Sequence, residues 1–210
     1  GAVTFSKEAD YPSNTWTDMY GKEFGDTFEF LNVQLASEHN MSTSGYGKAS
    51  IFADRNGDYV AIFRGGAVPG WAAYNVGNHI ANFNDNTVFD TAGRAPNPKI
   101  PADKLYKKIS YVVFDDSVTD CGIYTFNYAT GLKQCIYNSG LNIGNRTFSH
   151  AGAISTVLPF GTDASKYTGY ADLSQSGLTE FAGTFNISGT GVKKIRFPSG
   201  LKGLTDAALY

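Results

Sequence analysis

Short runs that alternate apolar and polar residues, separated by turn residues, recur along most of the chain. The clearest pair is Lys48–Asp54 and Tyr59–Phe63, with Asn56-Gly57 between them. Asn-Gly between two such runs is typical of a β-hairpin with a type I′ turn, because both central residues need positive φ. This stretch therefore predicts two antiparallel strands.

The two-residue turn also predicts a register for this hairpin. Ile51 pairs with Ile62 on one face of the sheet. Ala53 pairs with Val60 on the same face, and Phe63 lies on the other. Because both faces are apolar, we expect the hairpin to lie inside a sheet and not at its edge.

Further runs of the same kind predict additional strands. They cover residues 27–35, 71–76, 108–115, 122–128, 132–137, 153–160, 180–187 and 192–197. Helix signals are scarce, with a turn or two expected at 163–167 and at 173–181, and no internal repeat is found. The expected fold is all-β, an antiparallel sandwich or barrel with long loops. We expect residues 1–210 to form one β domain, excised from a longer chain.

The runs 122–128 and 132–137 form a second predicted hairpin, which bears on the two cysteines. In that register Cys121 lies about 16 Å along the strand from the partner of Cys135, too far for a disulfide. A turn centred on Tyr128 would instead allow a bridge, so the pairing stays open. Free thiols are slightly favoured, and they fit assembly in a reducing compartment.

Composition supports strands and excludes two classes of partner. The chain has 24 Gly, 13 Tyr and 15 Phe, which favours pleated, turn-rich structure over helices. A net charge of -2 gives none of the basic footprint expected of a nucleic-acid binder. No apolar run approaches the ~20 residues that span a bilayer, so we expect no membrane insertion.

No motif for catalysis or cofactor binding is found. His39, His79 and His150 are far apart and have no metal-ligand spacing. Asp115 and Asp116 are adjacent on one strand and point to opposite faces, so the two carboxylates do not jointly flank a glycosidic bond. We expect no catalytic residue, no metal and no cofactor.

Recognition chemistry is what remains. The segment 82–107 is a long connection with little periodicity, and such connections are often functional. Aromatic side chains near turns stack on sugars or anchor protein interfaces, although core packing is the alternative for Trp71 and Tyr74. The candidate ligand contacts are Trp16, Tyr20, Tyr46, Trp71, Tyr74, Asp85 and Asp90.

The stretches Phe24–Phe30 and Ile109–Asp115, in an all-β chain of this size, prompt a family resemblance. The chain resembles the capsid spike domain of a small non-enveloped RNA virus, most closely the avian astrovirus spike. The resemblance is one of overall size and texture, so no functional residue is carried over from it.

This resemblance implies a β-barrel-like core, a homodimer at the virion surface and exposure to antibodies. It also implies attachment to a host-cell receptor, which is a protein or a glycan, and this agrees with the expectation from the missing motifs that the protein is not an enzyme. A secreted bacterial or fungal carbohydrate-binding β-sandwich is the alternative, followed by a glycan-processing enzyme with carboxylates from distant strands.

Overall fold

A computed structural model describes most of the β-rich part of the chain. The described residues are 31–35, 42–53, 59–70, 109–122, 125–126, 129–143, 146–160, 162, 166–181 and 191–204. Within these ranges all twelve regular elements are β-strands. The predicted all-β fold class is therefore confirmed, and the arrangement in several sheets is compatible with a sandwich or barrel.

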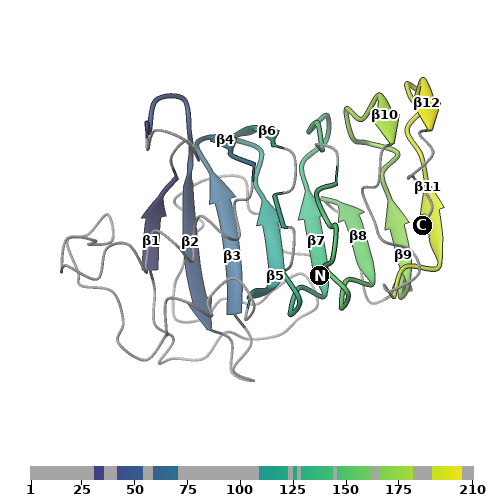
Figure 1. The fold of residues 1–210 in the computed structure, drawn as a ribbon, viewed down its shortest axis with the longest axis horizontal. Coiled ribbons are helices and arrows are strands. Elements are labelled where there is room, and N and C mark those ends of the chain that lie inside the picture. Colours follow the sequence, from purple (N-terminus) through teal and green to yellow (C-terminus); the bar gives the residue numbers. More distant parts are fainter. Residues whose placement is uncertain are drawn as a thin grey trace.

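One large sheet dominates the described part (Figure 1). Its order is β1 (Leu31–Gln34), β2 (Lys48–Ala53), β3 (Tyr59–Arg64), β5 (Ile109–Phe114), β7 (Gln134–Tyr137), β8 (Thr156–Pro159), β9 (Tyr170–Asp172) and β11 (Lys194–Arg196). Two smaller sheets each contain two strands. They are β4 (Gly66–Val68) with β6 (Val118–Cys121), and β10 (Glu180–Phe181) with β12 (Gly203–Leu204).

The predicted hairpin is confirmed as β2 and β3, which pair antiparallel and lie inside the large sheet. Its predicted register is wrong by one residue, because Ile51 pairs with Ala61 and Ala53 pairs with Tyr59. Five residues separate Ala53 from Tyr59 in the sequence, so the strands do not close on a two-residue turn. Ala61 and Phe63 belong to the core cluster.

The expectation of antiparallel pairing holds only for β1, β2 and β3. From β3 onward the large sheet is parallel, through β5, β7, β8, β9 and β11. The predicted second hairpin is wrong, since β7 pairs in parallel with β5 and β8 and the described residues of 122–128 are not strand. Alternation of apolar residues predicts a strand but not its partner, because the side-chain period is the same in both directions.

The parallel strands belong to stacked coils. β3, β5, β9 and β11 are each followed in sequence by a short strand of a smaller sheet: β4, β6, β10 and β12. Neighbouring coils pair Tyr111 with Gln134, Gln134 with Thr156 and Tyr170 with Lys194, which are 23, 22 and 24 residues apart. Only β8 and β9 are closer, at 14 residues. Such stacking is the arrangement of solenoid proteins.

This periodicity corrects the expectation of no internal repeat. Ser-Gly-Leu occurs at 139–141, 176–178 and 199–201, each time after a strand of the large sheet. Leu141 and Leu178 are buried, and Gly177 N–H donates to the Leu141 carbonyl at 2.8 Å. The uneven spacing of the three copies explains why the repeat is not evident in the sequence.

The other predictions have mixed outcomes. The predicted strands 27–35, 108–115, 132–137, 153–160, 180–187 and 192–197 contain β1, β5, β7, β8, β10 and β11. The prediction for 71–76 lies outside the described residues. A helical turn at 173–181 is wrong, because turns and β10 occupy that stretch, and 163–167 is described only in part. The sequence did not predict β4, β6, β9 or β12.

The core lies between the large sheet and the smaller ones, because buried residues of both contribute to it. Four phenylalanines pack at its centre: the ring of Phe126 lies 5.8 Å from Phe63, 5.7 Å from Phe114 and 5.9 Å from Phe148. Cys121 and Cys135 are buried in the same cluster as free thiols.

Candidate ligand-binding site

Three polar side chains stand side by side across the end of the antiparallel strands. Gln34 of β1 pairs with Lys48 of β2, which pairs in turn with Arg64 of β3. Direct cross-strand partners share one face of a sheet. Their sequence neighbours Ala49 and Phe63 belong to the core cluster, so the three polar side chains occupy the opposite face.

Two glycines make the corner between β3 and β4. Gly65 has a φ of 75° and Gly66 a φ of 147°, values that residues with a side chain rarely adopt. The corner directs the Gly65 N–H toward Ser117, whose Oγ accepts it at 2.8 Å. The corner of the β3 coil is thereby tied to the turn that follows β5.

Asp115 follows β5 and lies beside the end of β3, where its N–H donates to the Phe63 carbonyl at 3.1 Å. One oxygen of its buried carboxylate accepts from Ser117 N–H at 2.9 Å and from Ser117 Oγ at 2.5 Å. The Asn138 amide, from the next coil, donates to the carbonyls of Asp115 and Val118. These contacts hold the Asp115 turn in place.

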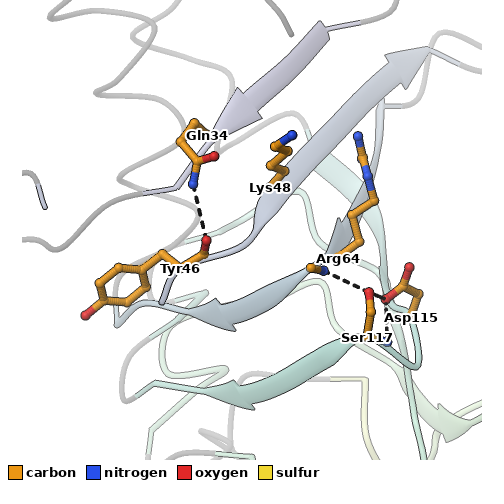
Figure 2. Close-up of a pocket in the computed structure, with 7 residues that line it drawn as sticks. Gln34, Tyr46, Lys48, Arg64, Asp115 and Ser117 are labelled. Carbon is orange, nitrogen blue, oxygen red and sulfur yellow. Dashed lines mark hydrogen bonds between the residues drawn. The ribbon is translucent and has the colours of Figure 1, made fainter. Parts of the chain in front are cut away.

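These residues surround a cavity of about 480 Å³, within the usual size range of small-molecule sites. Its lining comprises Gln34, Tyr46, Lys48, Arg64, Gly65, Asp115 and Ser117. In Figure 2 the side chains of Lys48 and Arg64 point in the same direction, while the ring of Tyr46 points away from both. The Tyr46 carbonyl accepts from the Gln34 amide at 3.2 Å.

The lining offers many hydrogen-bond donors and a few acceptors. Lys48 and Arg64 supply ammonium and guanidinium donors, and the Gln34 amide and the Asp115 carboxylate supply acceptor oxygens. The Ser117 hydroxyl is within an Asx-type turn with Asp115, and the described residues of the lining include no histidine or cysteine that could act as its partner. The arrangement is suited to holding a polar ligand.

Of the predicted contact residues, only Tyr46 falls within the described part of the chain, and it lines the cavity. Its half-buried ring packs against the core, so a ligand contact through the ring stays a prediction. The other six predicted contacts lie outside the described residues; they are Trp16, Tyr20, Trp71, Tyr74, Asp85 and Asp90.

Sequence reasoning missed the polar row of Gln34, Lys48 and Arg64. The signal was present, because Lys48 and Arg64 flank the apolar runs of the predicted hairpin. In the predicted register they are not partners, whereas in the observed register they face each other. The one-residue error therefore concealed the site.

Asp115 and Asp116 do not lie on one strand as predicted, because β5 ends at Phe114 and both residues follow it; Asp115 is buried and Asp116 is exposed. His150 lies at an exposed turn, and its Nδ1 is 2.9 Å from Ser149 Oγ. His39 and His79 fall outside the described residues. Within the described ranges no group of three His, Cys, Asp or Glu side chains is arranged to hold a metal ion.

A second surface feature lies at the other end of the large sheet. The rings of Tyr167 and Tyr170 stack with centroids 5.5 Å apart, and the Lys194 ammonium lies 5.3 Å from the Tyr170 centroid. Tyr167 is 40% exposed. The Tyr170 ring is already in contact with both Tyr167 and Lys194, so this pair is a weaker candidate than the cavity.

Comparisons with protein-family models, curated proteins and solved structures find no match for this chain. Among the described residues, no helix has the length and apolar character needed to cross a bilayer. Function is therefore inferred from the geometry of the cavity itself.

Proposed function

We propose that this protein is a surface recognition module that binds a hydroxyl-rich ligand, a glycan, without turning it over. The observation that carries the proposal is the cavity at the ends of β1, β2 and β3, closed on one side by the turn after β5. Sugar hydroxyls both donate and accept hydrogen bonds, and this lining offers both kinds of partner in one place.

The scaffold supports binding through contacts already in place. Lys48 and Arg64 project from paired strands of the large sheet, and the Asp115 turn is fixed by Ser117 and Asn138. A site held on strands loses little conformational freedom when a ligand enters, which favours affinity. Catalysis would need a nucleophile with a base or a pair of acids, and neither arrangement occurs among the lining residues that the structure describes.

A glycan array tests the proposal, with the native chain, Lys48→Trp and Lys202→Trp side by side. Lys48 lines the cavity, whereas Lys202 is exposed beside β12. An indole at position 48 fills the cavity, so we expect Lys48→Trp to lose the signal and Lys202→Trp to keep it. Thermal melts of both variants verify folding. A native chain that binds no glycan, or folded variants that bind equally, would contradict the proposal.

The setting of this recognition follows from the astrovirus resemblance. We propose that the module acts at a virion surface, where the glycan belongs to a host-cell receptor, and that it forms a homodimer there. Light scattering at high protein concentration tests the dimer. A strict monomer would oppose the virion setting and favour the secreted carbohydrate-binding module, because glycan binding at the cavity requires one chain only.

A further inference from the structure

Two positive charges face each other in the cavity. Lys48 and Arg64 are direct cross-strand partners, and like charges in that position destabilise a sheet. Figure 2 shows both side chains extending in the same direction from their paired strands. Among the described residues the Lys48 ammonium has neither an ion pair nor a hydrogen-bond partner.

The described charged side chains of the lining sum to a positive charge. Asp115 brings one negative charge against the two positive charges of Lys48 and Arg64, so these three described residues have a formal sum of +1. One carboxylate oxygen of Asp115 already accepts two hydrogen bonds from Ser117. An anionic group between the Lys48 and Arg64 side chains would relieve their repulsion, which a neutral hydroxyl does far less well.

We infer that the ligand of this site is an acidic saccharide, whose carboxylate or sulfate group binds between Lys48 and Arg64. The inference rests on the proposed glycan-binding function and names its ligand class. Guanidinium presents two parallel N–H donors that match the geometry of a carboxylate or sulfate, and the ammonium adds a point charge. Gln34 and the Gly65–Ser117 corner remain at the cavity wall for the sugar hydroxyls.

Calorimetric titration with three saccharides of equal length tests the inference. They are an oligogalacturonate, its fully methyl-esterified neutral form and a sulfated galacto-oligosaccharide. Because hydrogen bonds to charged groups are stronger than neutral ones, we expect an acidic ligand to bind about tenfold or more tightly than the neutral ester. Raising the salt from about 0.05 to about 0.5 M should weaken only acidic binding. Whichever acidic saccharide binds more tightly, the oligogalacturonate or the sulfated galacto-oligosaccharide, shows whether the site prefers a carboxylate or a sulfate.

Variants at position 48 separate charge from shape. Lys48→Met should lose the preference for acidic over neutral saccharides, Lys48→Arg should keep the preference, and Lys202→Met should behave as the native chain. Equal affinity of the native chain for acidic and neutral forms would overturn the inference while the glycan-binding function stands. Binding of none of the saccharides here, combined with a blank array, would overturn both.

Discussion

The antiparallel strands β1–β3 and the parallel coils from β5 to β12 differ in the distance along the chain between pairing partners. Ala53 and Tyr59 pair six positions apart, whereas Tyr111 and Gln134 pair 23 positions apart. The short connection makes the hairpin visible in the local sequence, while a parallel pair needs a crossover that carries no local signal. The candidate site lies where the two regions meet, since its lining combines β1–β3 with the turn after β5.

A shared aromatic core is what we expect to join the two regions. Phe114 of β5 is fully buried, with its ring 5.4 Å from Phe63 of β3 and 5.7 Å from Phe126. Phe114→Ala should lower the free energy of unfolding by about 3–5 kcal/mol, because it leaves a cavity between the regions. Denaturant titration followed by circular dichroism and tyrosine fluorescence measures the loss.

Both probes should report one transition in the native chain and in Phe114→Ala. The exposed Thr119 of β6 supplies a control, since Thr119→Ala removes little contact. Separate transitions for the two probes in the native chain, or equal stability of the Phe114 and Thr119 variants, would show that the regions do not share a core.

Close backbone packing between Gly122 and Gly70 should also contribute to the stability of the fold. A Cβ at Gly122 would overlap the backbone nitrogen of Gly70 and lie 2.8 Å from its Cα, whereas a Cβ at Gly200 meets no atom within 4 Å. Gly122→Ala should therefore cost about 1–3 kcal/mol through overpacking. Gly200→Ala should be nearly neutral. Thermal melts of the pair measure the difference, and equal melting temperatures would disprove the close stacking of β4 against β6.

Two buried ionisable side chains of β7 should make the free energy of unfolding depend on pH in the alkaline range. Burial raises the pKa of the Cys135 thiol and that of the Tyr137 phenol. Above about pH 8.5 the unfolded thiol loses its proton while the folded thiol keeps it, so stability falls by about 1.4 kcal/mol per pH unit. The phenol adds a similar slope above about pH 10.

Unfolding titrations between about pH 7 and about pH 10 measure this slope. Above about pH 8.5 the stability of Cys135→Ala should fall less steeply with pH than that of the native chain, whatever its absolute stability, and below that pH the two slopes should agree. Identical slopes for the two proteins would mean that the thiol at position 135 is not shielded from water.

The smallest effect is expected at the far edge of the parallel region. Arg196 of β11 lies 3.9 Å from the Asp172 carboxylate, and its side chain is 64% exposed. Solvent weakens such pairs, so Arg196→Ala should change the free energy of unfolding by less than about 1 kcal/mol. A larger loss in denaturant titration would indicate that this edge is more tightly packed than the exposure suggests.

Sequence reasoning reached all strands of the large sheet except β9, but not their order. The two strands of the predicted hairpin correspond to β2 and β3, and six further predicted strands contain observed ones, because alternating apolar residues indicate burial on a pleated surface. The short strands β4, β6, β9 and β12 were missed, since two to four residues give too brief a pattern. The parallel order of the strands depends on packing between coils that are distant in sequence. The recurrent Ser-Gly-Leu is the sequence feature that indicates these coils.

The site was harder to predict than the fold. Lys48 and Arg64 become neighbours through a register that a single extra loop residue alters. Asp115 joins them through the coil stacking, because it follows β5, the parallel neighbour of β3. The sequence instead favoured aromatic residues near turns as ligand contacts. Of these, Tyr46 alone lies in the described part of the chain, and its ring packs on the core.

Hydrogen exchange on the chain with and without oligogalacturonate tests most directly whether recognition occurs at the junction of the two regions. Ligand should slow exchange of amides around the cavity, at 46–48, 64–66 and 115–118, and leave β8, β9 and β11 unchanged. Protection confined to β9 and β11, beside the Tyr167–Tyr170 pair, would contradict the assignment of the site to the cavity.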